Sequence, residues 1–139
     1  MVSDPISPLG AVAIEAFGAA ILVLVIFALT DHRNQTRLVK YVTPLAIGAT
    51  IAVLIGVLAP YTQAGLNPAR DFGPRLVALF AGWGNIAIPG PANGFWVYIV
   101  GPLLGGIVGA GTYQFLVRKL IRRTSITQRS RRLPEERIP

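Results

Sequence analysis

The chain has 139 residues, no cysteine and a single histidine, His32. These absences exclude disulfide bonds, thiolate metal sites and a metal centre built from several histidines of one chain. Charge is scarce too, because 14% of the residues are charged and 53% are hydrophobic. With a mean hydropathy of +0.57, the sequence is too apolar for an ordinary soluble domain of this length. No cofactor or metal is expected.

Three long stretches carry no lysine or arginine, and each is close to the roughly 20 residues that cross a bilayer as a helix. They are residues 6–30, 42–60 and 95–117. The first is too long, and the residues before it carry too little positive charge, for a cleavable signal peptide. The sequence therefore predicts an all-α membrane protein with three transmembrane helices.

The formal net charge of +7 is unevenly distributed along the chain. Three basic residues lie in the loop 31–40 and eight follow from Arg118 onward, while residues 1–10 contain none. Basic loops stay on the cytoplasmic side, so we expect an external N-terminus and a cytoplasmic basic tail at 122–139 in the plasma membrane. The tail has no aromatic residues for stacking on bases, so we interpret it as a topology signal and a contact for anionic lipid, not a nucleic-acid site.

Small residues recur in two of the predicted spans. Gly101, Gly105 and Gly109 are spaced four residues apart in the third span, and the second span is rich in small residues, namely Ala46, Gly48, Ala49, Ala52 and Gly56. Such residues let helix backbones approach closely. We interpret them as sites of helix packing within one subunit.

The segment between the second and third spans, 61–94, is too long for a simple connection. It contains an apolar helical pattern over 71–82 that is too short to cross a bilayer. Segments of that length are more often re-entrant or interfacial. We predict a re-entrant half-helix over about 68–81, which enters from the external side and returns to it.

This half-helix begins in a polar cluster at membrane depth. Asn67 is a favoured N-cap, and Pro68 is tolerated at the first helical position. Arg70 adds a permanent charge with five hydrogen-bond donors. Together with the positive end of the helix dipole, these groups would bind a neutral polar solute and repel cations. Alone, the four residues 67–70 are also compatible with an ordinary capped helix start.

The longer motif that runs from Gly65 to Arg75 is more specific. It resembles the second signature of the major intrinsic protein family, the aquaporins and glycerol facilitators. The similarity extends to about residue 121 and includes residues 27–31, 95–98 and 101–102. Family members have six spans and two inverted repeats. The resemblance therefore implies that residues 1–121 are a half-channel that corresponds to the second repeat.

The resemblance also implies roles for individual residues. Asn67, Pro68 and Ala69 would form the pore-centre box, with the Asn67 amide donating to the permeating molecule, and Arg70 would belong to the outer selectivity filter. Glu15 is an ionisable residue inside a span, which needs hydrogen-bond donors because exposure to lipid is costly. The family's buried glutamate receives them from the loop before the half-helix, here 62–66.

The interaction of Glu15 with the loop would hold the carbonyls of Gly65 and Leu66 toward the pore. By the same resemblance, Asp71 would support the structure of this site. Ile55 and Ala64 would complete the filter.

The markers of solute preference conflict. Asp71 and Arg75 are similar to the glycerol-facilitator branch, as is Ile99, whereas Tyr98 is closer to the water channels. Water and glycerol therefore remain open, and we expect a passive channel for water and small uncharged solutes such as glycerol.

The family pattern implies that half a pore needs a complementary N-terminal half, and full-length relatives are tetramers. An external N-terminus without a signal sequence favours a fragment of a longer gene. The alternative is a non-conducting membrane protein that associates with a complementary half or with full-length relatives. An enzyme is not expected, because no nucleophile–base pair is evident and Glu15 and His32 lie near opposite ends of one span.

Overall fold

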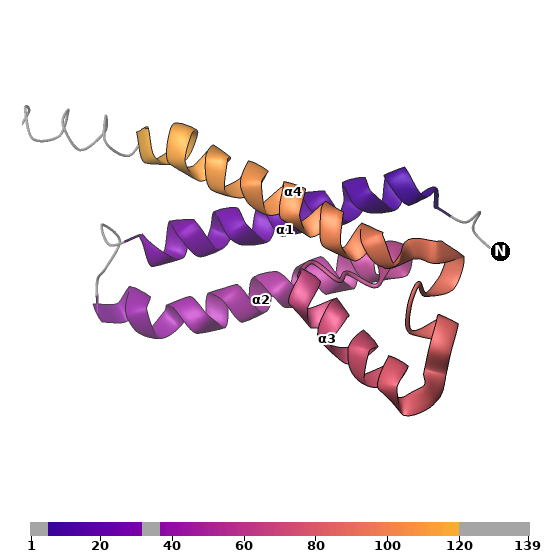
Figure 1. Ribbon diagram of the computed structural model, residues 1–139. Coiled ribbons are helices and arrows are strands. Elements are labelled where there is room, and N and C mark those ends of the chain that lie inside the picture. Colours follow the sequence, from indigo (N-terminus) through magenta and orange to yellow (C-terminus); the bar gives the residue numbers. More distant parts are fainter. Residues whose placement is uncertain (1–5, 32–36, 120–139) are drawn as a thin grey trace, which may run out of the picture.

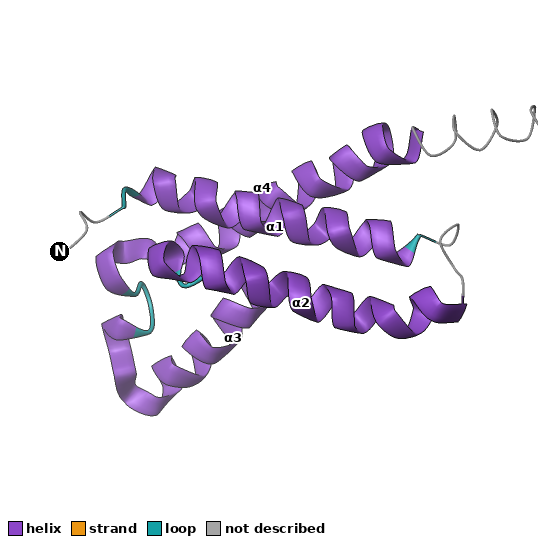
Figure 2. Ribbon diagram, turned by 180° about the vertical axis from the view of Figure 1, so that it is seen from behind, coloured by secondary structure: helices purple, strands orange, loops and turns teal. Residues whose placement is uncertain are grey.

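The computed structural model describes residues 6–31 and 37–119. In these residues nearly all of the chain is helical and there is no β-strand, which confirms the all-α class (Figure 2). The long helices are α1 (Pro8–Thr30), α2 (Arg37–Thr62) and α4 (Val97–Thr112), and the shorter α3 (Pro68–Ala78) lies between α2 and α4. His32 and the basic tail 122–139 lie outside the described residues.

Three segments are long and apolar enough to cross a membrane, as predicted. They are Pro8–Thr30, Tyr41–Thr62 and Ala92–Val117, against the predicted 6–30, 42–60 and 95–117. The second ends two residues later than expected, because the helix continues through Pro60 instead of ending there. A proline inside a helix removes one backbone hydrogen bond, and this helix contains two prolines.

Helices α1 and α4 run in the same direction and cross closely, while α2 runs antiparallel beside α1 (Figure 1). The crossing depends on the glycines of α4. A Cβ atom added at Gly105 would overlap the backbone of Ala16, and one added at Gly109 would overlap the backbone of Ala20. This confirms that the glycine series of the third span packs within one subunit. The close approach gives dispersion contacts where the hydrophobic effect is weak.

The small residues of α2 behave differently. Added Cβ atoms at Gly48 and Gly56 would meet no described atom within 4 Å, and Ala52 is exposed. In the described part of the chain, no other helix therefore packs against these two glycines. Only the opposite face of α2 is buried, where Leu54 and Leu58 form a small core with Leu66.

The remaining segment folds back on itself. Helix α3 follows α2 after a short loop, contacts α4, and slants outward from the other helices (Figure 1). None of its residues, all of them described, is buried. The helical segment predicted over 68–81 is an α-helix up to Ala78 and then a π-helical turn at Leu79–Trp83, which is kinked at Gly82 with a φ of 89°.

Short 3₁₀ turns at Gly84–Ile86 and Pro91–Trp96 then return the chain to the start of α4. At the other end of α4, a second π-helical turn, Tyr113–Val117, follows the helix. There the Tyr113 hydroxyl donates to the carboxylate of Asp31 at the end of α1. The two parallel helices are thus joined at this end as well as at their crossing.

Candidate functional site

The loop that joins α2 to α3, residues 63–67, has an unusual backbone. Gln63, Ala64 and Leu66 have positive φ angles of 62°, 50° and 54°. Left-handed conformations of residues other than glycine cost on the order of 1–3 kcal/mol each and persist only where the surroundings hold them. Side chains from three different helices contact this loop, and we call residues 62–66 the pore loop below.

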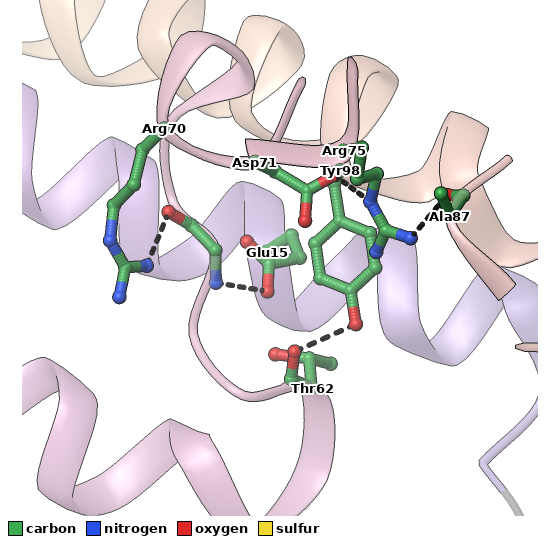
Figure 3. Close-up of polar contacts among 8 residues, drawn as sticks. Glu15, Thr62, Arg70, Asp71, Arg75, Ala87 and Tyr98 are labelled. Carbon is green, nitrogen blue, oxygen red and sulfur yellow. Dashed lines mark hydrogen bonds and ion pairs between the residues drawn. The ribbon is translucent and has the colours of Figure 1, made fainter. Parts of the chain in front are cut away.

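Glu15 of α1 binds the amides of the pore loop. Its side chain is fully buried, and Oε1 accepts from the Gly65 N–H at 3.0 Å (Figure 3). Oε2 accepts from the Leu66 N–H at 2.6 Å. These are the hydrogen bonds expected for Glu15 and the loop. Because the carboxylate takes up the N–H groups, the carbonyl oxygens remain as the loop's acceptors toward the other side.

Arg70 of α3 binds two of those carbonyls. Its Nη1 donates to the Ala64 carbonyl oxygen at 2.7 Å and to the Gly65 carbonyl oxygen at 3.1 Å. The side chain lies on the opposite side of the loop from Glu15 (Figure 3). No described residue accepts a hydrogen bond from its Nε or Nη2, so these donors are free toward the open side. The guanidinium is thereby fixed in position while keeping donors for a ligand.

Asn67 caps the start of α3. Its Oδ1 accepts from the backbone N–H of Ala69 at 2.9 Å and of Arg70 at 3.4 Å, and Pro68 follows at the first helical position. The capping oxygen faces the helix, so the Nδ2 amide is left as a donor, and it meets no described acceptor. Asp71 in the first turn and Arg75 in the last turn complement the helix dipole.

Two of the three residues that we interpreted as markers of the glycerol branch, Asp71 and Arg75, form an ion pair. Arg75 Nε lies 2.6 Å from Asp71 Oδ2, and Arg75 Nη1 donates to the Ala87 carbonyl at 3.0 Å. Sequence reasoning missed Ala87, because nothing local signals a contact between residues 12 positions apart. Through it, α3 is tied to the short turns that follow.

Tyr98 joins the same cluster from α4. Its ring centroid lies 5.4 Å from Arg75 Cζ, and its hydroxyl donates to the Thr62 carbonyl at 2.9 Å. Phe95 lies 5.9 Å from the same guanidinium. Sequence reasoning identified Tyr98 as a marker and placed Thr62 in the loop, but it predicted neither the hydrogen bond between them nor the contact of Phe95 with Arg75. The repeated aromatics near the start of the third span were the available signal.

The remaining site candidates are placed less directly. Ala64 is fully buried in the small core with Leu54 and Leu58, so its side chain does not reach the open side. It meets Arg70 through its carbonyl oxygen alone. Ile55 packs partly against the same core, and Ile99 is half-buried on α4.

An open cavity of about 740 Å³ lies at the end of the molecule where α1 begins. Its wall includes Gln63 and Gly65 of the connecting loop, both Arg70 and Arg75, and the rings of Trp83, Phe95 and Tyr98. Hydrogen-bonding groups and aromatic faces thus converge on one space. That combination suits a small solute with hydroxyl groups and a carbon backbone.

Comparisons with known proteins agree with the family that the sequence motif resembles. The model of the major intrinsic protein family matches residues 1–113. The glycerol uptake facilitator of Escherichia coli (strain K12) is 45% identical over 109 residues, which are 77% of this chain and 38% of the relative. The corresponding protein of Haemophilus influenzae is 44% identical over 107 residues, which are 76% of this chain and 40% of the relative.

The propanediol uptake facilitator PduF of Citrobacter freundii is 40% identical over 111 residues, which are 78% of this chain and 41% of the relative. The chain thus spans about two fifths of the length of these relatives. The match nevertheless covers α1 to α4 together with the pore loop. This chain therefore belongs to the major intrinsic protein family.

Proposed function

We propose that the chain forms half of a passive channel for small uncharged solutes, with polyols such as glycerol as the main class and water as a second. The observation that carries this proposal is the division of hydrogen-bonding groups at the pore loop. Glu15 takes the N–H groups of Gly65 and Leu66, and Arg70 binds the Ala64 and Gly65 carbonyl oxygens with Nη1 alone. The Arg70 Nε and Nη2 and the Asn67 Nδ2 therefore remain as donors for a ligand, beside the second lone pair of the Ala64 carbonyl oxygen. A hydroxyl group both donates and accepts, and it can use both kinds of partner.

The order of the groups suggests a route. A solute enters the external cavity, passes Arg70 and the carbonyl oxygens of Ala64 and Gly65, and then meets the amide of Asn67 at the start of α3. We further propose that Ile55, which packs partly against the small core, gives the filter an apolar side. Arg70 and the positive end of the α3 dipole repel cations along this route.

Two observations support the proposed preference for polyols. The relatives' names refer to glycerol and propanediol, which each carry more than one hydroxyl group. In this chain, Asp71 and Arg75 are paired with each other, so their charges are neutralised beside the cavity instead of binding a charged solute. The family match points to a channel and not to an enzyme.

A complementary N-terminal half is part of the proposal. Helix α3 buries none of its described residues, and the glycines Gly48 and Gly56 of α2 meet no described atom. A second half placed against these faces would close the pore around Asn67 and Arg70. We further propose a plasma-membrane protein with an external N-terminus and a cytoplasmic basic tail, and a tetramer of complete pores.

Stopped-flow light scattering tests the proposal. Liposomes that contain the chain are mixed with sucrose, which reports water efflux, and then with glycerol, which reports glycerol entry. Asn67→Ala removes both the cap and the free amide and should abolish any rapid flux. Arg118→Ala, which removes a charge at the other end of α4, is the matched control.

The complementary half expected from the family is added in a second series. Rapid flux only in that series supports the half-channel. Rates equal to those of empty liposomes in both series, with insertion verified, would favour the non-conducting alternative.

A further inference from the structure

Tyr98 contacts the pore loop in a way that the proposed function leaves without a role. Glu15 holds the loop's amides and Arg70 holds two of its carbonyls. Tyr98, from α4, holds the point at which the loop begins, because its hydroxyl donates to the Thr62 carbonyl at 2.9 Å. Three helices therefore fix the loop through three different side chains (Figure 3).

The Tyr98 hydroxyl donates a hydrogen bond to the Thr62 carbonyl oxygen, which would otherwise be buried without a donor. Thr62 is the last residue of α2 and is 4% exposed. The last carbonyls of a helix have no partner within the helix. The chain turns into the left-handed conformation at Gln63 and Ala64 directly after this residue, so no further helical turn supplies a donor. The Tyr98 hydroxyl provides it.

The ring of Tyr98 also supports the middle of the loop. A Cβ atom added at Gly65 would lie 2.6 Å from Tyr98 Cδ1, so the Gly65 backbone packs directly on the ring. The ring is held in turn by the Arg75 guanidinium, whose Cζ lies 5.4 Å from its centroid. Arg75 is itself fixed by Asp71 and by the Ala87 carbonyl.

We propose that Tyr98 is a positioning residue for the outer filter. Its hydroxyl and ring fix the path of the backbone from Thr62 to Gly65, and the Gly65 carbonyl is one of the two acceptors that hold Arg70. The distance between the loop and the guanidinium, and hence the opening that a solute crosses, depends on this tyrosine. The effect on solutes rests on the proposed function, whereas the effect on the loop does not.

Hydrogen–deuterium exchange of the full chain in liposomes measures the loop directly. In Tyr98→Phe, the ring remains and one hydrogen bond is lost, so the amides of residues 63–66 should exchange about three- to tenfold faster. Tyr98→Leu also removes the ring beneath Gly65 and should increase exchange further. Tyr61→Phe is the matched control, because Tyr61 is 59% exposed at the same end of α2.

Unchanged exchange at 63–66 in Tyr98→Phe would overturn the proposal, and so would faster exchange spread evenly over α1, α2 and α4. Where wild-type liposomes conduct, Tyr98→Phe should also change the ratio of glycerol to water permeability, and Tyr61→Phe should not. If liposomes with the wild-type chain do not conduct, the proposed function is contradicted but the role of Tyr98 is not. The exchange comparison still tests that role.

Discussion

Glu15 is the residue on which the pore loop depends most directly. It is fully buried, and both of its carboxylate oxygens are occupied by loop amides. A buried carboxylate is stable only if donors surround it, and three of the neighbouring loop residues adopt strained left-handed conformations. The carboxylate and the loop therefore stabilise each other, and neither is expected to keep its arrangement alone.

Glu15→Gln should destabilise the chain by about 1–3 kcal/mol, because the amide NH₂ replaces one acceptor and faces a loop N–H. The free energy of unfolding in detergent micelles measures the effect. Thr30→Val is the control, since its hydroxyl bonds only the Ile26 carbonyl at the exposed end of α1. Equal stability of Glu15→Gln and wild type would show that the loop does not need the carboxylate.

Arg70→Ala should widen the filter, because the guanidinium spans the open side of the loop and binds two carbonyls. Conducting liposomes should then admit larger polyols, and the permeability to xylitol relative to glycerol should rise. Arg70→Lys keeps the charge and one donor nitrogen for the two carbonyls, but it lacks the Nε and Nη2 donors that face the open side, so it should show an intermediate ratio. If neither variant changed the ratio, Arg70 would not form the filter.

At the level of elements, the described helices differ in how closely they pack: α1 and α4 are in tight contact, whereas α3 packs little against the rest of the chain. Helices α1 and α4 meet through the glycines of α4, whereas α3 buries none of its described residues. In a membrane, packing of small residues replaces the hydrophobic effect as the main attraction between helices. We therefore expect the pair α1 and α4 to be the stable part of the chain and α3 to depend on its two ends.

Gly105→Val tests the tight contact. The added side chain would overlap the backbone of Ala16 and force α4 away from α1, which should cost at least about 1–3 kcal/mol. Gly111→Val on the same helix is the control, because an added Cβ there meets no described atom within 4 Å. Denaturant titration in mixed micelles compares the two. Similar stabilities would contradict the packing described for α4.

The elements that follow from local pattern could be predicted from the sequence, and those that follow from tertiary contacts could not. Long apolar runs between charges gave the three spans, and Asn67-Pro68 marked the start of α3. Hydropathy carries no information on the left-handed residues of the pore loop, since these depend on Glu15, some 50 positions away. The hydrogen bond of Tyr98 to Thr62 depends likewise on a neighbour distant in sequence.

The contact partners of the small residues could likewise not be predicted from the sequence. Four-residue spacing indicates a close helix contact but not which helix supplies the other side. Gly105 meets Ala16 within the chain, while Gly48 and Gly56 meet no described atom. The presence of small residues in a span could not by itself show which of them contact another helix of this chain.

At the level of the whole molecule, the open face of α2 marks where a complementary half would bind. Ala52 lies between Gly48 and Gly56 on that face and is exposed. On α4, Ile107 is 71% exposed but large and apolar, as expected of a side chain that faces lipid. The natural chain has no cysteine, so a single introduced thiol reports on one position only.

Ala52→Cys should form a disulfide cross-link with a cysteine scan of the complementary half when the two are produced in the same membrane. Gel mobility under non-reducing conditions measures the product. Ile107→Cys should give none and serves as the control. Equal cross-linking at both positions, or a product with twice the mass of this chain, would contradict the proposed arrangement.

The contact between α4 and α1 also limits how this protein can evolve. The atoms that an added Cβ at Gly105 or Gly109 would overlap belong to the main chain of Ala16 and Ala20, not to their side chains. A main chain cannot be made smaller by mutation, so no substitution at residues 16 or 20 can compensate for a larger residue at either glycine. Second-site suppressors of such changes should therefore be absent from α1, and both glycines should stay fixed even while the surrounding apolar residues vary freely.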